Sequence, residues 1–208
     1  TIFFSGCTLK CVFCQNWDIS QKVNGIYIKP EKMVDIIKRR KKQGSKNVNW
    51  VGGEPTPNIY YILKILEKLD VNIPQIWNSN MYCSVESMKL LDGIIDLYLT
   101  DFKYGNNKCA KKLSKVDNYF EIVTRNHKIA YENGNMIVRH LVMSNHFECC
   151  SKPIIDWISK KIPDSMVNIM GQYRPEYNAK KYENIARSIK IEEIKKVKNY
   201  AEKKISTI

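Results

Sequence analysis

Three cysteines near the start of the chain could hold a metal centre. Cys7, Cys11 and Cys14 follow directly after the apolar run at residues 2–4. A zinc site usually needs four nitrogen or sulfur ligands in two pairs, whereas three closely spaced thiolates suit an iron–sulfur cluster with one metal corner left open. The spacing therefore favours a cluster over the alternatives, which are a fragmentary zinc site and reduced thiols without a metal.

Further polar or glycine residues follow each of the other strand-like runs. Glycines lack a Cβ and would let a ligand approach the backbone, and a glutamate beside them adds a charge. These residues are Gly52, Gly53 and Glu54 after the second run, Asn78, Ser79 and Asn80 after the third, Asp101 and Lys103 after the fourth, Arg139 and His140 in the fifth, and Gln172 and Tyr173 after the sixth.

The elements that must position these residues are six short apolar runs. They span residues 2–4, 48–51, 73–77, 95–100, 136–141 and 166–170. Helix-period segments separate them: one from Pro30 to about Gln43, one carrying Ile59 to Leu66, one capped by Ser84, one from Asp117 or Asn118 to Gly134, one capped by Ser151, and one carrying Ile191 to Ala201. This alternation predicts βα units and a parallel sheet.

Six βα units are too few to close an eight-stranded barrel. We therefore expect an α/β fold, a partial (β/α)6 TIM-like barrel with parallel strands, open on one side. The loops after parallel strands gather at one face of such a sheet, so the polar residues above should meet there. The long connection at residues 174–190 should form a lid or an extra helical turn.

Composition bounds the class of protein. The 208 residues carry a formal net charge of +13 and are 44% hydrophobic, which is enough for one core, so we expect a single domain over residues 1–208. No apolar run approaches the roughly 20 residues that span a bilayer, and the seven cysteines argue for a reducing, cytoplasmic setting.

Since the chain begins at Thr1, we expect that residues of a longer polypeptide precede it. The basic runs at residues 38–42 and 195–204 fall on polar helix faces, which favours a solvated surface over a nucleic-acid groove.

The spacing C-x3-C-x2-C, with Phe13 before the last cysteine, resembles the signature of radical S-adenosylmethionine (SAM) enzymes. The Gly52-Gly53-Glu54 turn, Asp101-x-Lys103, Arg139 and the pair Gln15-Asn16 are similar to the branch that contains pyruvate formate-lyase activating enzymes. The resemblance implies that the three cysteines bind three irons of a 4Fe-4S cluster, that SAM chelates the fourth, and that an electron from the cluster splits SAM. The resulting 5'-deoxyadenosyl radical would take a hydrogen atom from a substrate, in this branch from a glycine of a partner protein.

The same resemblance implies roles for individual residues. Phe13 would lie against the adenine of SAM, and the Gly52 to Glu54 turn would receive its ammonium group. Asp101, Lys103 and Arg139 would serve the carboxylate end, while Asn78 and Asn80 would face the ribose or a monovalent cation. Gln172 or Tyr173 stands where the activating enzymes carry a histidine, a departure that bears on the substrate. A reduced ferredoxin or flavodoxin would supply electrons.

Two other hypotheses remain open at this stage. Radical chemistry could act on a small molecule or an RNA base, or the chain could be a zinc-stabilised basic binding module without catalysis. Of the histidines, we expect His127 to be a surface or packing residue, His140 to lie in the core, and His146 to be a loop residue rather than a proton shuttle. We expect the remaining cysteines, Cys83, Cys109, Cys149 and Cys150, to be unligated thiols rather than a second cluster, since they have no C-x2-C spacing.

Overall fold

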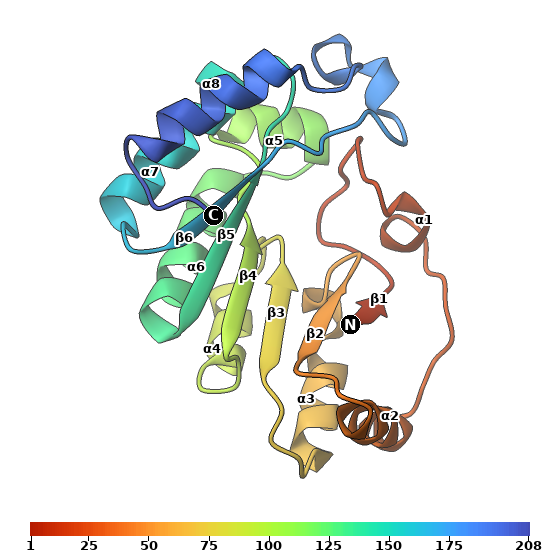
Figure 1. Ribbon diagram of the computed structural model, residues 1–208. Helices are drawn as coiled ribbons and strands as arrows, with labels where there is room; N and C mark the ends of the chain where they lie inside the picture. Colours follow the sequence, from red (N-terminus) through yellow and green to blue (C-terminus); the bar gives the residue numbers. More distant parts are fainter.

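The computed structural model describes residues 1–208 and contains one six-stranded sheet. Its strands are β1 (Ile2–Phe4), β2 (Val48–Gly52), β3 (Gln75–Ser79), β4 (Leu97–Asp101), β5 (Asn135–Leu141) and β6 (Met166–Met170). They lie side by side in sequence order, and every neighbouring pair is parallel. Because β1 and β6 do not pair, the sheet stays open, which confirms the partial barrel (Figure 1).

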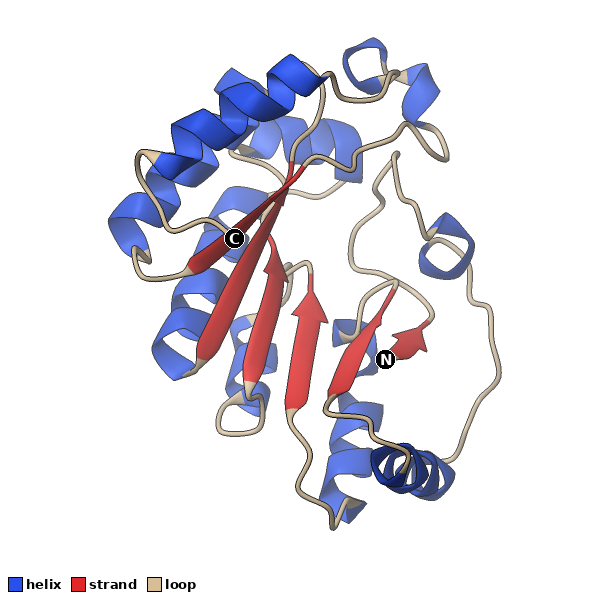
Figure 2. Cartoon of the chain, in the orientation of Figure 1, coloured by secondary structure: helices blue, strands red, loops and turns tan.

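Helices connect the strands and flank the sheet (Figure 2). Six match the predicted segments: α2 (Pro30–Lys42), α3 (Ile59–Lys68), α4 (Val85–Leu91), α6 (Tyr119–Asn133), α7 (Lys152–Lys161) and α8 (Ile191–Glu202). Ser84 caps α4 as expected, because its side chain accepts a hydrogen bond from the amide of Ser87. None of these helices has the length and apolar composition required to cross a bilayer.

Two helices were not predicted, α1 (Trp17–Ser20) and α5 (Asn107–Ser114). The first is a single turn, and the second has a weak apolar pattern of Ala110 and Leu113 among lysines. A side-chain cap starts α5, where Asn106 accepts a hydrogen bond from the amide of Cys109. Short helices depend on such caps and on tertiary contacts more than on periodicity, so sequence reasoning missed both.

The core lies between the sheet and its helices. Trp50 and Trp77 are register partners on β2 and β3, and both are fully buried. Burial alternates along these strands, so that one face packs on the helices and the intervening residues face the concave side. The alternation places β-strand residues such as Val51 and Asn78 toward the open interior of the crescent.

The junction between β5 and α7 differs from the prediction. A π-helical turn, η2 (Phe147–Ser151), runs directly into α7, and Ser151 has helical backbone angles instead of a capping conformation. Its hydroxyl bonds to His140 Nε2 at 2.8 Å, and His140 Nδ1 bonds to the carbonyl of Phe102 at 2.8 Å. His140 is therefore a core histidine, as predicted. The Ser151 hydroxyl bonds to His140 and does not cap α7. His127 is also fully buried, against Phe102 and Trp157.

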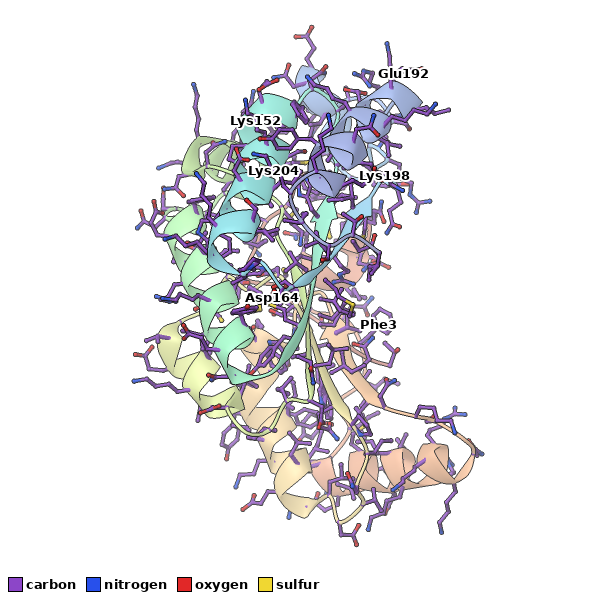
Figure 3. The ribbon with its side chains drawn as sticks, turned by 60° about the vertical axis from the view of Figure 1, so that its left-hand side comes forward. Phe3, Lys152, Asp164, Glu192, Lys198 and Lys204 are labelled. Carbon is purple, nitrogen blue, oxygen red and sulfur yellow. The ribbon has the colours of Figure 1, made fainter.

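The connection after β6 contains two short 3-10 turns, η3 (Ala179–Lys181) and η4 (Glu183–Ile185), which match the expected extra helical turns. The amide of Asn178 donates to the carbonyl of Val12, so this segment lies against the cysteine loop. On the outer surface, Lys152 of α7 and Lys198 and Glu192 of α8 are exposed, as Figure 3 shows. In the two predicted basic runs, residues 39–42, Lys195, Lys196, Lys203 and Lys204 are exposed, and the choice of a solvated surface over a nucleic-acid groove stays a prediction.

Candidate active site

One cavity of about 260 Å³ lies at the carboxyl ends of the strands. Every residue predicted for the cluster or SAM lines it: Cys7, Cys11, Phe13, Cys14, Gly52, Gly53, Glu54, Asn78, Asn80, Asp101, Lys103, Arg139 and Gln172. Gln15 and Asn16 line it as well. The structure therefore brings the whole set together from all six strand ends, and the roles assigned to these residues remain predictions.

The three cysteines present their sulfurs to polar neighbours. Cys11 Sγ lies 3.0 Å from Ser114 Oγ, and Cys14 Sγ lies 3.0 Å from Ser20 Oγ. Cys7 Sγ accepts hydrogen bonds from the amide of Leu9 at 3.3 Å and from Asn80 Nδ2 at 3.5 Å. Hydrogen bonds to thiolate sulfurs tune the potential of an iron–sulfur cluster.

Burial raises the pKa of the Cys7 thiol, and the nearby Glu54 carboxylate raises it further. Burial also raises the pKa of Cys11, while the ammonium of Lys103 opposes that shift. These thiols hold their protons when no metal is bound, so a metal that binds them must displace protons.

The glycines at the end of β2 pack tightly against β1 and the start of the cysteine loop. A Cβ on Gly52 would stand 2.1 Å from the amide nitrogen of Phe4, and one on Gly53 would stand 2.2 Å from the carbonyl oxygen of Gly6. The amide of Gly53 donates to the carbonyl of Phe4 at 2.8 Å. The glycines are thus required for close packing on β1 and the cysteine loop, a reason that differs from the ligand approach expected from sequence.

Glu54 is buried, with 2% of its surface exposed, and is held by the end of β3. Its Oε1 accepts from Ser79 Oγ at 2.6 Å and Thr56 Oγ1 at 2.6 Å, and its Oε2 accepts from the amide of Asn80 at 2.9 Å. Burial raises the pKa of Glu54, and these hydrogen bonds oppose the shift. Ser79 was not assigned a role from sequence, yet it fixes the orientation of this carboxylate.

Three charged side chains, Asp101, Lys103 and Arg139, line the cavity together. Asp101 pairs with Lys103 at 2.5 Å and with Arg139 at 2.7 Å. Register brings Asp101 and Arg139 opposite each other on β4 and β5. Burial alone would raise the pKa of Asp101, but Lys103 and Arg139 outweigh it and hold that pKa below its ordinary value. Two cations against one anion leave one excess positive charge.

The Arg139 guanidinium makes one further hydrogen bond and has one donor without a partner. Its Nη2 donates to Asn78 Oδ1 at 2.6 Å, whereas its Nε is buried without a partner. A buried donor without a partner costs free energy, and Lys103 and Arg139 together carry more positive charge than Asp101 balances. The arrangement suits an anionic group such as a carboxylate.

The remaining predicted residues differ in what they touch. Phe13 packs edge-on against Tyr104 and Tyr173. Gln172 lines the cavity, whereas Tyr173 is buried and donates to the carbonyl of Ile185, so of the two candidates only Gln172 is exposed to the cavity. Asn80 Oδ1 accepts from the amide of Tyr82, which leaves it partly engaged.

The histidine and cysteines without a predicted role lie in two different places. His146 is 6% exposed and lies with Cys109 and Cys149, which the sequence spacing did not indicate because α5 was not predicted. Cys83 lies apart, beside the side chain of Asn126. None of these residues lines the cavity at the strand ends.

The donor set at the cavity fits an iron–sulfur cluster. The cavity lining contains three cysteines from one loop and no histidine or further cysteine. Its two carboxylates are engaged, Glu54 with Ser79 and Asp101 with Lys103 and Arg139. A fourth metal corner would therefore be available to a ligand other than protein.

Comparison with known proteins agrees with this chemistry. The family profile of the Radical SAM superfamily matches residues 1–158. An uncharacterised protein of Methanocaldococcus jannaschii is 55% identical over 210 residues, covering 98% of this chain and 62% of the relative. The chain thus spans about 62% of the length of that curated relative.

Two solved structures share the fold. SuiB of Streptococcus suis bound to S-adenosylmethionine has a TM-score of 0.68 and 14% identity, over 99% of this chain and 48% of SuiB. A domain of pyruvate-formate lyase-activating enzyme from Bacteroides vulgatus has a TM-score of 0.63 and 15% identity, over 79% of this chain and 98% of that domain.

Proposed function

Because the chain belongs to the radical SAM superfamily, we propose that it is a radical SAM enzyme in which Cys7, Cys11 and Cys14 bind a 4Fe-4S cluster. The observation that carries the proposal is that this cysteine loop and the Gly52 to Glu54 turn line one cavity. When bound, the cluster supplies the electron that cleaves SAM to a 5'-deoxyadenosyl radical. Membership of an enzyme superfamily argues against the non-catalytic zinc module.

The residues of the chain would bind SAM by its charges. The excess positive charge of Lys103 and Arg139 over Asp101 favours the SAM carboxylate. The Glu54 carboxylate, oriented by Ser79 and Asn80, would accept the SAM ammonium group.

Other residues would enclose the nucleoside. Phe13 and Gln172 line the cavity and would contact the adenine and ribose. Asn78 is engaged with Arg139 and would orient that guanidinium. The binding of a monovalent cation stays a prediction. Both oxygens of Asp101 already pair with cations, Lys103 and Arg139, so a bound cation would have to share the carboxylate with them.

The substrate we propose is a glycine of a partner protein. The fold resembles a domain of a pyruvate-formate lyase-activating enzyme, and SuiB of similar fold was solved with its precursor peptide bound, so this architecture admits a peptide in that protein. The sheet is not closed between β1 and β6, and we propose that the partner loop enters on that side, past the connection after β6 that lies against the cysteine loop. A reduced ferredoxin or flavodoxin would be the electron donor. A small molecule or an RNA base is the alternative substrate.

Anaerobic reconstitution with iron and sulfide tests the cofactor. We expect a brown protein that gives an electron paramagnetic resonance signal on reduction and a changed signal when SAM is added. Replacement of Cys7, Cys11 and Cys14 by alanine should abolish iron binding and the signal, whereas Cys83→Ala should retain both. A colourless wild-type protein that binds one zinc ion per chain in the cysteine loop would contradict the proposal.

Isotope transfer tests the substrate. Candidate proteins, peptides, small molecules and RNA deuterated at defined positions would be incubated with the reduced enzyme and SAM. Deuterium should appear in 5'-deoxyadenosine with a glycine-labelled protein. Transfer from RNA or a small molecule alone would refute the glycine assignment and leave the radical chemistry in place.

A further inference from the structure

A second group of metal-ligating side chains lies outside the cavity. Cys109 lies in the first turn of α5, His146 directly precedes η2, and Cys149 lies within η2. Their ligand atoms lie within 4.8 Å of one another, and this is the chain's one group of three such residues with this geometry. Cys109 Sγ and Cys149 Sγ are 3.8 Å apart.

The separation of the two sulfurs suits a single ion. Tetrahedral zinc with Zn–S bonds of about 2.3 Å places two thiolate sulfurs about 3.8 Å apart. Thiolates that bind different irons of a cluster lie further apart than this, because the irons themselves separate them. The geometry therefore indicates one thiophilic ion and not a second iron–sulfur cluster.

The ring of His146 is oriented as a metal ligand requires. Its Nδ1 lies 2.7 Å from the carbonyl oxygen of Ser144, and a carbonyl only accepts, so Nδ1 carries the hydrogen. The lone pair of Nε2 is then free for a metal. Histidine ligands of metals commonly donate their other N–H to a backbone carbonyl in this way.

Asn106 ties the two cysteine segments together. Its Oδ1 accepts from the amide of Cys109 at 2.8 Å, and its Nδ2 donates to the carbonyl of Cys149 at 2.6 Å. The same Nδ2 lies 3.4 Å from Cys109 Sγ. A single side chain thus fixes the positions of both thiols and provides a hydrogen bond to one of them.

We infer that Cys109, His146 and Cys149 bind one zinc ion through two thiolates and one imidazole. The site opens onto a pocket of about 470 Å³ that is also lined by Lys112, Tyr182 and Asn184. Zinc with three protein ligands keeps a fourth coordination position for water or another small ligand.

The ion would fix the position of α5, the helix that supports the cysteine loop at the strand-end cavity. The last residues of α5 accept hydrogen bonds from the cysteine loop, Leu113 from the amide of Val12 and Ser114 from the amide of Lys10, each at 2.9 Å. Zinc at the other end of α5 ties this helix to the connection between β5 and α7. The zinc site is independent of the proposed function, since it shares no ligand with the cavity.

Cobalt titration tests the site without interference from the first cysteine loop. The full chain with Cys7, Cys11 and Cys14 replaced by alanine would be titrated anaerobically with Co²⁺ under reducing conditions. We expect one equivalent to bind with a thiolate-to-cobalt charge-transfer absorption, and Zn²⁺ to displace it. In that background Cys109→Ser or His146→Gln should weaken binding by at least about 10- to 100-fold, the loss typical even of outer-shell changes. Cys83→Ala is the matched control and should leave the affinity unchanged.

A second measurement needs no variant. Zinc added to the wild-type chain should protect Cys109 and Cys149 from alkylation by iodoacetamide, as read by peptide mass spectrometry, and a chelator should reverse the protection. Absence of stoichiometric cobalt binding in a folded protein would overturn the inference. So would cobalt binding that survives Cys109→Ser with Cys149→Ser, or a Cys109–Cys149 disulfide that persists in reductant.

Discussion

At the scale of single residues, the charges of the cavity are arranged before any ligand binds. Asp101 holds Lys103 and Arg139 in fixed positions, and register across β4 and β5 decides which cation it meets. Fixed charges in a partly buried site need little reorganisation when a charged ligand arrives.

Arg139→Gln should weaken SAM binding to the reconstituted protein. A lost hydrogen bond to a charged group costs about 1.5–3 kcal/mol, or roughly a 10- to 150-fold higher Kd. Isothermal titration with SAM measures the effect. Arg40→Gln, on the exposed end of α2, is the control and should not change the Kd. An unchanged Kd in Arg139→Gln would remove this residue from the SAM site.

His127 should make the stability of the metal-free chain depend on pH. Burial lowers the pKa of His127 to about 4, so between pH 4 and its ordinary value of 6.5 the unfolded state binds more protons than the folded state. Stability should therefore rise with pH through this window and be lost as the pH falls.

Urea unfolding at a series of pH values checks this. His127→Leu should reduce the slope by up to about 1.4 kcal/mol per pH unit relative to wild type, whatever its effect on absolute stability. Equal slopes in the two proteins would mean that the histidine is protonated, or solvated, in the folded state.

At the scale of elements, the cysteine loop is supported from two sides. The β2 turn packs on it through Gly52 and Gly53, and the end of α5 accepts hydrogen bonds from it. Residues far apart in sequence thus hold the three thiols at the cavity. The Glu54 carboxylate adds a link from the same turn to the end of β3.

Gly53→Ala should destabilise this junction severely. The added Cβ would stand 2.2 Å from the Gly6 carbonyl oxygen, a backbone atom that cannot turn away, and such overlaps cost several kcal/mol, here about 3 or more. Gly134→Ala is the matched control, since its Cβ would meet no atom closer than 3.7 Å. Chemical denaturation compares the two. Equal stability of both variants would show that the loop moves aside freely.

At the scale of the whole molecule, the sheet is a crescent whose six strand ends all contribute to one cavity. A ligand bound there contacts residues from β1 through β6 and so opposes separation of the two halves of the sheet. The sheet is not closed between β1 and β6 (Figure 1), and on that side the connection after β6 lies against the cysteine loop through the hydrogen bond from the Asn178 amide to the Val12 carbonyl.

SAM should therefore raise the global stability of the cluster-loaded protein. A ligand at 100 times its Kd adds about 2.7 kcal/mol to the free energy of unfolding. Anaerobic urea unfolding with and without SAM measures the shift. Adenosine, which lacks the charged amino acid group, should give a smaller shift at equal concentration. An identical curve with and without SAM would argue against binding in the cavity.

Much of the fold and of the site could be predicted because each depends on local patterns. The apolar runs alternate with helix-period segments, so the parallel sheet and the order of its strands followed. Polar residues after strands must meet at the carboxyl edge, and those predicted for the site all line the cavity. By contrast, α5 depends on the Asn106 cap and on packing. The Ser151 hydroxyl bonds to His140 and does not cap α7, a long-range contact that no local pattern predicts.

The sequence by itself determined the fold class, the cysteine loop and the set of polar residues at the strand ends, because strand period and chain order alone fix which residues share an edge. Tertiary structure decided that Gly52 and Gly53 serve close packing on β1 and the Gly6 loop, that Ser79 orients Glu54, and that Cys109 meets His146 and Cys149. These relations join residues 25 to 48 positions apart in the chain, and only packing of the elements sets such distances.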